Sequence, residues 1–155
     1  MIADVPVRIA TAADAAGIAA MSRDYIEYGL PWGWTEARVT RSIRDPDANV
    51  VVVTEPERII GFGIMRYNKD DAHLLLMAVH HERRRAGIAS ALLLWLEAVA
   101  RVAGAKRIRV EARQENVAAR NFYSEHGYHE RAIRQRMYSG VVHGVQLEKW
   151  LRAAA

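Results

Sequence analysis

The sequence predicts an α/β fold of the α+β kind. It has a mixed, mostly antiparallel sheet of seven strands, a central parallel strand–helix–strand crossover and about four helices. A nearly continuous apolar segment at 72–79 is followed by a long apolar helix pattern and then by an alternating strand pattern at 107–113. Two strands joined by one helix in the same sheet require a parallel, right-handed crossover. The other strand patterns are neighbours along the chain, which favours antiparallel hairpins.

One strand and two helices are predicted first. The strand covers 5–10, and a helix starts at Thr11, where Asp14 follows at the spacing of a capping box. The stretch LPWGW interrupts the helical pattern, and a second helix begins with Thr35 as its N-cap.

The middle of the chain predicts a hairpin followed by the crossover. β-Branched runs within 49–67 flank a turn at residues 55–58. The apolar segment 72–79 predicts a strand that is covered on both faces. The crossover helix is predicted to bury one stripe of side chains, formed by Ile88, Leu92, Trp95, Val99 and Val102.

The last part predicts a strand, a short helix and two more strands. Residues 107–113 alternate between apolar and charged side chains, as in a strand with one buried face. A helix follows from its N-cap Asn116 and ends at Gly127. Strands near 129–138 and 142–151 complete a single predicted domain, residues 1–155.

Composition excludes several kinds of chemistry. The chain has no cysteine, so disulfides, thiolate metal sites and cysteine-acyl intermediates are excluded, and a cytoplasmic location is expected. The histidines lack metal-ligand spacing, so no metal site is predicted. Glu97 and Arg101 interrupt the most apolar run, which is therefore not a membrane span. The net charge of +4 is spread along the chain and does not favour nucleic-acid binding.

The stretch ERRRAGIASALLL, residues 82–94, places arginines and a glycine directly before the crossover helix. The first amides of a helix and its dipole both favour an anion. Gly87 and Ala89 let an anion approach the backbone, Ser90 adds a hydroxyl, and Arg84 and Arg85 add positive charge. The segment thus suits a diphosphate, and the alternative is a tight turn with a solvated basic patch.

Two segments resemble the signatures of the GNAT N-acetyltransferases. MAVHHERRRAGIASALL resembles the acetyl-CoA signature Arg/Gln-x-x-Gly-x-Gly/Ala, as Arg84-x-x-Gly87-x-Ala89. ENVAARNFYSEHGY resembles the second signature, at the separation that is usual in the family. The predicted order of elements matches this family over nearly the whole chain.

The resemblance implies acetyl-CoA as cosubstrate and roles for named residues. Tyr123 would protonate the departing thiolate, and Asn116 would contact the pantetheine arm. Two positions depart from the family pattern, because His81 stands where proline is common and Arg85 where glycine is common. The implied cofactor-binding residues are Met77, Ala78 and Val79 for pantetheine and Arg84, Arg85, Ala86, Gly87, Ile88, Ala89 and Ser90 for the diphosphate.

Glu111 is the candidate general base. It precedes Tyr123 by twelve residues, a spacing that resembles the ribosomal-protein alanine N-acetyltransferases, where the matching glutamate acts as base. The alternative is an ion pair of Glu111 with Arg109 or Arg113. Weaker candidates for the base are Asp70, Asp71 and His73. The alternative for Tyr123 is a structural role, as an aromatic side chain packed in the core.

The loop between the first two helices carries three candidate substrate residues: Tyr28, Trp32 and Trp34. In the resembled family this loop borders the acceptor, and LPWGWTE is similar to the aromatic substrate loop of the ribosomal-protein branch. Aromatic faces can form an apolar or cation-binding wall. The alternative, favoured for one of the two tryptophans, is a hydrophobic plug between helices.

The predicted function is acetyl transfer from acetyl-CoA directly to a primary amine of a small molecule or a protein. Three alternatives stay open: a protein N-terminal acetyltransferase, a non-catalytic acyl-CoA-binding module, and a nucleic-acid binder that uses the arginines at 83–85. The expected partner is an amine acceptor, with neither nucleic acid nor membrane, and the resemblance also allows a homodimer. The identity of the amine stays open.

Overall fold

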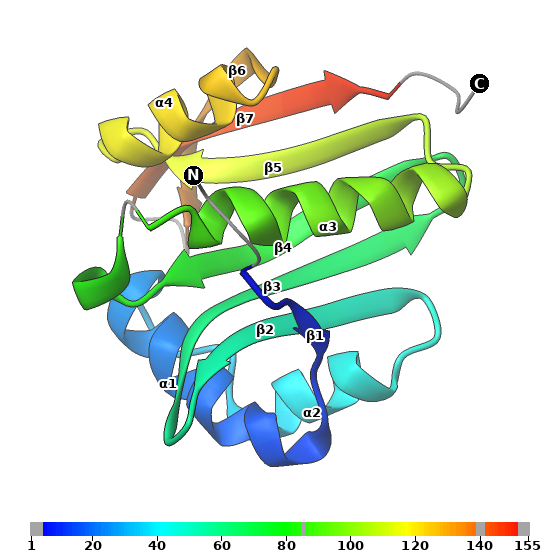
Figure 1. The fold of residues 1–155 in the computed structure, drawn as a ribbon. Helices are drawn as coiled ribbons and strands as arrows, with labels where there is room; N and C mark the ends of the chain where they lie inside the picture. The colour runs from blue at the N-terminus through cyan, green and yellow to red at the C-terminus, as the bar shows by residue number, and fades with distance from the viewer. Residues whose placement is uncertain (1–4, 85, 139–141, 152–155) are drawn as a thin grey trace. The chain divides into compact units, whose positions relative to one another are not determined.

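A computed structural model of the chain describes residues 5–84, 86–138 and 142–151. Its strands form one seven-stranded sheet in the order β1-β2-β3-β4-β5-β7-β6 (Figure 1). β4 and β5 are parallel, whereas β1–β2, β2–β3, β5–β7 and β6–β7 are antiparallel. The predicted fold class is therefore confirmed.

The elements are β1 (Arg8–Ile9), η1 (Ala12–Asp14), α1 (Ala15–Tyr25), α2 (Glu36–Arg44), β2 (Ala48–Glu55), β3 (Arg58–Asn68), β4 (Asp71–Val79), η2 (His81–Arg83), α3 (Ile88–Val102), β5 (Arg107–Arg113), α4 (Val117–Glu125), β6 (His129–Tyr138) and β7 (Val142–Trp150).

Two compact units make up the chain. The first contains Met1–Arg66 and Leu75–Val99, and the second contains Tyr67–Leu74 and Ala100–Ala155. Because β3 and β4 each contribute residues to both units, the boundary does not follow the ends of elements. A single domain over residues 1–155 stays a prediction.

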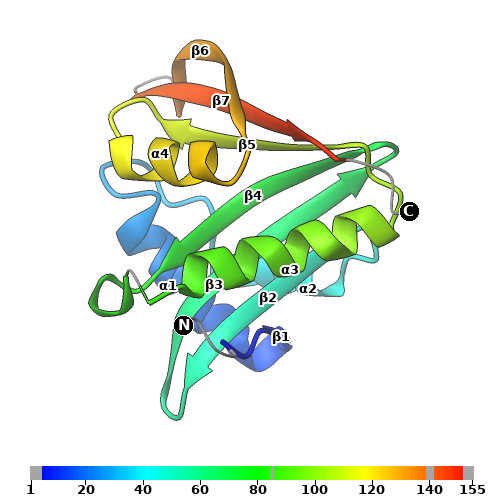
Figure 2. The same cartoon turned by 45° about the horizontal axis from the view of Figure 1, so that its top comes forward.

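In the first unit, helix α3 packs on β3, and its course along the sheet can be followed in Figures 1 and 2. A Cβ atom built on Gly61 would lie 2.9 Å from Ile88 Cγ2, and one on Gly63 would lie 2.9 Å from Leu96 Cδ1. Cβ atoms essentially never approach other atoms that closely, so these two glycines allow the helix to pack where it does. The start of α3 is thereby held over β3.

The predicted buried stripe of α3 is confirmed at Ile88 and Leu92, which are buried, and is wrong at Val102. Val102 is 91% exposed. The fully buried face is turned by about 90° around the helix axis relative to the prediction. The run ALLLWL is apolar on most sides, so its pattern fits more than one face, and the two glycines of β3 select the observed one. The buried residues of this helix are Ile88, Leu92, Leu93, Leu96, Glu97 and Ala100.

Strand β4 is fully buried on one face and half-buried on the other, so the prediction that both faces are covered is confirmed only in part. Its first residues alternate: Ala72, Leu74 and Leu76 are buried, whereas His73 and Leu75 are half-buried. A run of apolar residues can thus form a strand with one partly open face, because accessible leucines are common in folded proteins.

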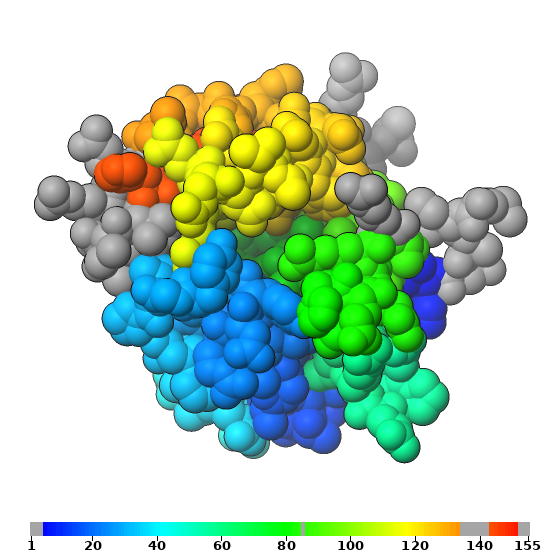
Figure 3. All heavy atoms as spheres, turned by 90° about the vertical axis from the view of Figure 1, so that its left-hand side faces the viewer, coloured from blue at the N-terminus to red at the C-terminus, as the bar shows by residue number. Residues whose placement is uncertain are grey.

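Two segments of the first unit reach the surface on one face of the molecule (Figure 3). One is the loop between α1 and α2, and the other is the segment between β4 and α3. Tyr25 at the end of α1 connects them, since its hydroxyl lies 2.8 Å from Nδ1 of His81.

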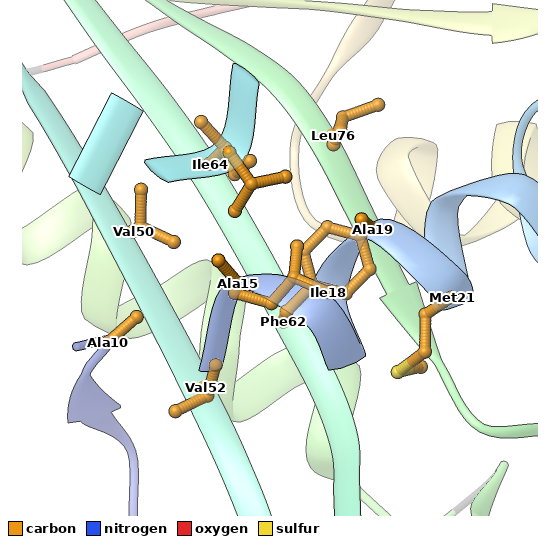
Figure 4. Close-up of a cluster of buried hydrophobic side chains, with 11 residues drawn as sticks. Ala10, Ala15, Ile18, Ala19, Met21, Val50, Val52, Phe62, Ile64 and Leu76 are labelled. Carbon is orange, nitrogen blue, oxygen red and sulfur yellow. The ribbon is translucent and has the colours of Figure 1, made fainter. Parts of the chain in front are cut away.

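Helices α1 and α2 cover the other face of β2 and β3. Alternation along β3 places Phe62 and Ile64 on this face, opposite the two glycines that meet α3. Figure 4 shows α1 packed against these strands. The cluster consists of Ala10, Ala15, Ile18, Ala19, Met21, Val39, Val50, Val52, Phe62, Ile64 and Leu76.

The second unit is built on β5, β7 and β6, with α4 beside β6 (Figure 2). The predicted alternation of β5 is confirmed, because Ile108, Val110 and Ala112 are buried on one face. Arg113 departs from it, since it too is buried. The N-cap of α4 is also confirmed, because Asn116 Oδ1 accepts from the Ala119 N–H at 3.1 Å.

None of the helices in the described residues has the length and apolar character needed to cross a membrane.

We expect Gly63→Val to destabilise the protein. Its side chain would overlap Leu96, which already lies 2.9 Å from the position of a Cβ atom. Overpacking of this kind costs about 1–3 kcal/mol in the free energy of unfolding. Chemical denaturation measures the change, and Gly33→Ala, whose Cβ would make contacts of 3.4 and 3.5 Å, is the control. Equal stability of Gly63→Val and wild type would contradict this account of the α3–β3 packing.

Asp14 links strand β1 to the start of the helical region. Its carboxylate accepts from Arg8 Nη1 at 2.8 Å and Nη2 at 2.9 Å, and from the Thr11 N–H at 2.8 Å. The hydrogen bond from Arg8 lowers the pKa of Asp14. The predicted capping box is confirmed. Because the pKa of Asp14 is lower in the folded than in the unfolded protein, its carboxylate stabilises the folded state. This stabilisation is fully present above the unfolded pKa of about 3.9 and is lost as pH falls through the folded pKa.

We therefore expect Asp14→Asn to lower the free energy of unfolding by about 1 kcal/mol at pH 7, since Arg8 is partly exposed and solvent screens the pair. The gap between variant and wild type should narrow below about pH 4, as the wild-type carboxyl protonates. Urea denaturation at both pH values measures the gap. Asp24→Asn is the control, because Asp24 and Arg23 form an exposed pair. A gap that stays constant down to pH 2 would contradict the assigned role of the Asp14 charge.

Candidate functional site

The start of α3 has backbone features that favour an anion. Gly87 has φ +79°, in the left-handed region that glycine adopts without strain. The Ala91 N–H donates to the Gly87 carbonyl at 3.0 Å. The amides of Ile88 and Ala89 precede this bond, in the part of a helix whose N–H groups have no partner within the helix. These amides and the helix dipole favour an anion.

The arginines next to this turn have different roles. Arg83 Nε donates to Glu55 Oε2 at 2.8 Å, and this hydrogen bond lowers the pKa of Glu55. Arg58 donates to Glu82 at 3.1 Å. These two pairs tie η2 to the β2–β3 hairpin, so Arg83 is a structural residue here. Arg84 is exposed and has no ion pair within the described part of the chain.

Of the other residues predicted to bind the cofactor, Val79 is buried, and Met77, Ala78 and Ser90 are half-buried. Ala86 is exposed at the turn. Arg85 lies outside the described residues.

Two histidines and an acid follow β4 directly. His80, His81 and Glu82 each offer one ligand atom within 4.8 Å of the others, an arrangement that could hold a metal ion. Two contacts compete with this use: His80 Nδ1 accepts from the Glu82 N–H at 3.2 Å, and Arg58 binds the Glu82 carboxylate. That the chain has no metal site stays a prediction.

Glu27 anchors the loop between α1 and α2, a role that sequence reasoning missed. Its carboxylate accepts from the hydroxyl of the buried Ser22 at 2.8 Å. It also accepts from the amides of Gly33 at 2.7 Å and Trp34 at 3.2 Å. A single glutamate therefore fixes both ends of the aromatic loop. No periodic pattern marks Glu27 in the sequence, because its contacts with Gly33 and Trp34 depend on the conformation of the loop.

The two tryptophans of this loop have different surroundings. Trp34 packs against the buried cluster of the first unit, and the Arg38 guanidinium lies 3.9 Å from its ring centroid. Trp34 is therefore the hydrophobic plug expected for one of the two. Trp32 is 43% exposed and Tyr28 is also exposed. Their contact with an acceptor stays a prediction.

Glu111 in the second unit contacts a histidine. His73 Nε2 lies 2.9 Å from Glu111 Oε1. Both side chains are partly exposed and come from the adjacent parallel strands β4 and β5. His73 ranked as a weaker candidate in the sequence, but the structure places it against the predicted base. A histidine next to a carboxylate can orient it and take part in proton transfer.

Charged pairs extend along the same face of the second unit. Arg107 donates to both oxygens of Asp71, at 3.0 and 2.7 Å, and to Glu148 at 3.1 Å. The Arg107 hydrogen bonds lower the pKa of Asp71. Asp71 is thus part of an ion-pair network, which weakens it as a candidate base. Asp70 lies 3.7 Å from Lys106 in an exposed pair.

Helix α4 holds the remaining two candidates. Tyr123 is 6% exposed, and its ring meets those of Phe122 and Tyr128 edge-on at 5.3 and 5.5 Å. Asn116 caps the helix through Oδ1, and its Nδ2 amide supplies two further donors. Seven residues apart, the two share one side of the helix.

The predicted residues thus fall into two groups. The turn, β4 residues 77–79 and the aromatic loop belong to the first unit, and Tyr25, His81 and Arg84 connect the turn to the end of α1. Glu111, Asn116 and Tyr123 belong to the second unit.

The family of the chain follows from its sequence match. Residues 18–128 match the Acetyltransferase (GNAT) family, so the chain belongs to this family. The match includes the β4–α3 turn, β5 and α4. An uncharacterized N-acetyltransferase of Methanocaldococcus jannaschii is 34% identical over 82 residues, which are 52% of this chain. That stretch spans 53% of the curated relative, about half its length.

Solved structures share the fold at low sequence identity. The ribosomal-protein-S18-alanine N-acetyltransferase from Escherichia coli matches with a TM-score of 0.82 and 21% identity, over 97% of this chain and 96% of that one. Ard1 from Thermoplasma volcanium matches with a TM-score of 0.83 and 23% identity, over 95% and 97%. A candidate streptothricin acetyltransferase from Bacillus anthracis, solved in complex with acetyl coenzyme A, has a TM-score of 0.65 and 21% identity, over 72% and 67%.

Proposed function

We propose that the protein transfers an acetyl group from acetyl-CoA directly to a primary amine. The observation that carries the proposal is the turn around Gly87 at the start of α3, within the stretch that matches the family. Backbone amides there suit the diphosphate of coenzyme A, and Arg84 adds a positive charge that no described ion pair neutralises. A relative of the same fold binds acetyl coenzyme A, which supports this choice of cosubstrate.

The proposed reaction needs no covalent enzyme intermediate. The neutral amine attacks the thioester carbonyl, the C–S bond breaks, and the coenzyme A thiolate leaves. The amine loses a proton and the thiolate gains one, so a base and an acid are both useful. We assign the base to Glu111 and the acid to Tyr123, and we assign Asn116 to the pantetheine arm through its Nδ2 donors.

The need for the base depends on the acceptor. Deprotonation at pH 7 costs about 4–5 kcal/mol for a lysine-type amine of pKa ~10.4, but only about 1 kcal/mol for an α-amine near 8. The pair of His73 with Glu111 supports the assignment, because the histidine orients one carboxylate oxygen.

A protein N-terminal acetyltransferase is a second candidate. The Glu-x-Arg-x-x-Asn pattern from Glu111 to Asn116 favours it, as does the fold shared with the ribosomal-protein-S18-alanine enzyme.

A panel of amines screened for thiol release from acetyl-CoA tests the proposal. The panel contains amino acids, lysine derivatives, polyamines, amino sugars and peptides with free N-termini. Amine-dependent release of coenzyme A is the expected result. Binding of acetyl-CoA without turnover of any amine would instead indicate a non-catalytic acyl-CoA-binding module. Salt-dependent nucleic-acid binding without acetyl-CoA binding would contradict the proposal altogether.

We expect Tyr123→Phe to lower kcat by about 100-fold or more, because loss of a general acid typically costs 10²–10⁴ in rate. The ring contacts with Phe122 and Tyr128 do not involve the hydroxyl, so the fold should persist. Acetyl-CoA affinity, measured by calorimetry, should stay similar. Phe122→Leu, a neighbour on the same helix, is the control for packing. Unchanged kcat in Tyr123→Phe would remove Tyr123 from the mechanism.

We expect Glu111→Gln to impair acetylation of lysine-like amines by about 100-fold or more at pH 7, and of low-pKa amines by less. Rates for a series of amines of graded pKa measure the trend. His73→Gln should produce a smaller loss with the same trend, because it removes an orienting contact and leaves the carboxylate.

The matched control is Glu130→Gln, which removes a carboxylate that pairs with Arg120 elsewhere in the second unit. It should leave the rates unchanged. An equal loss for all amines in Glu111→Gln would show that Glu111 is a structural ion-pair partner.

A further inference from the structure

We infer that the acceptor is a small amine that also carries a carboxylate, and that Arg109 binds this carboxylate while the amine faces Glu111. The inference rests on the proposed acetyl transfer and on the assignment of Glu111 as base. Its evidence lies in the hydrogen bonding of the charged face in the second unit.

Arg109 has one guanidinium donor, Nε, from which no described group accepts a hydrogen bond. Its Nε is buried and has no hydrogen-bond partner in the described structure. The nearest carboxylate oxygen, Asp71 Oδ2, lies 3.6 Å from this atom, beyond hydrogen-bond distance. Nε itself is buried, but the side chain as a whole is 38% exposed, so a ligand can reach part of it. A buried donor without a partner is rare in folded proteins and calls for an explanation.

The neighbouring carboxylates are already used by another arginine. Arg107 donates to both oxygens of Asp71 and to one oxygen of Glu148. Glu148 lies opposite Arg109 in the β5–β7 pairing, yet it is bonded to Arg107 and also lies 3.6 Å from Arg131. Arg109 therefore shares Asp71 in a 3.6 Å ion pair, but the hydrogen bonds of both carboxylates go to Arg107. A planar guanidinium suits a carboxylate ligand that can accept two parallel hydrogen bonds.

The spacing between Arg109 and Glu111, the proposed base, limits the distance between the carboxylate and the amine of the ligand. Arg109 and Glu111 are two residues apart on β5, so their side chains lie on the same face, roughly 6.6 Å apart along the strand. His73 is the register partner of Arg109 and contacts Glu111, so it lies next to both. An amino acid has its ammonium and carboxylate on one carbon or a few carbons, which fits side chains at this spacing.

The same face argues against polyamines and other polycations. Such acceptors need several carboxylates that are not neutralised. Of the described acids of this face, Asp71 and Glu148 pair with arginines, which leaves Glu111 beside His73. A positive charge at Arg109 would also repel a second ammonium group.

The experiment compares free amino acids with their carboxamides as acceptors, by release of coenzyme A from acetyl-CoA. Each carboxamide keeps the side chain and the α-amine but removes the carboxylate charge. Because the carboxamide amine is the weaker base, rates are compared per concentration of neutral amine. We expect kcat/KM for the preferred amino acid to exceed that of its carboxamide by roughly 10- to 100-fold, the range for a charge-assisted hydrogen bond.

Arg109→Gln should remove this preference while acetylation of the carboxamide changes little. Arg109→Lys keeps the charge and should retain part of the preference, which keeps the test valid if Arg109→Gln unfolds. Arg66→Gln is the matched control, since Arg66 is 63% exposed and lies 4.0 Å from Asp45. A second readout needs no turnover: calorimetry should show tighter binding of the N-acetyl amino acid product than of its carboxamide.

Equal use of amino acids and carboxamides, or an equal loss for both in Arg109→Gln, would overturn the inference and leave the proposed acetyl transfer standing. Acetylation of peptide N-termini in preference to free amino acids would overturn it as well, in favour of a protein acceptor. Failure of every amine to release coenzyme A would instead overturn the proposed function, and this inference with it.

Discussion

The close packing of α3 on β3 is the constraint on which the candidate cofactor turn depends. Gly61 and Gly63 bring the helix so near the strand that Ile88 and Leu96 occupy the space of absent side chains. Ile88 is also the first residue of α3, directly after Gly87. The packing of one helix therefore fixes where its first amides lie. The Arg83–Glu55 and Arg58–Glu82 pairs hold the preceding η2 turn to the β2–β3 hairpin from the other side.

The arginines of both units differ in whether carboxylates accept their hydrogen bonds. Arg83 and Arg107 donate hydrogen bonds to carboxylates, and these bonds lower the pKa values of Glu55 and Asp71. Arg84 and Arg109 are near these saturated networks but form no hydrogen bond of comparable quality in the described structure. The positions of arginines in the sequence do not distinguish these two groups. The number of carboxylate oxygens around each arginine in the fold decides whether it has donors left for a ligand.

The sequence predicted most of the fold because its signals are local. Thr35 and Asn116 both cap helices, as their residue types and positions indicated. The alternation of 107–113 identified the buried face of β5. The orientation of α3 was not predictable in the same way, since its apolar residues surround most of the helix. Glycines some thirty residues earlier in the chain select the buried face, and no periodicity within the helix records that.

In the candidate site, too, local signals could be predicted from the sequence and contacts between distant residues could not. The signatures around Gly87 and Asn116–Tyr123 are contiguous, so they could be found by spacing alone. The contacts of Glu27 with Gly33 and of His73 with Glu111 depend on loop closure and strand register, which the sequence does not spell out. Register also explains why Glu111 meets a histidine from β4, whereas sequence reasoning considered only the arginines on its own strand.

A crystal structure of the protein with acetyl-CoA tests the central claim most directly, because the claim concerns which backbone groups receive the diphosphate. We expect phosphate oxygens roughly 2.7–3.2 Å from the amide nitrogens of Gly87, Ile88 and Ala89. Acetyl-CoA bound with its diphosphate elsewhere, and with these amides facing solvent, would contradict it.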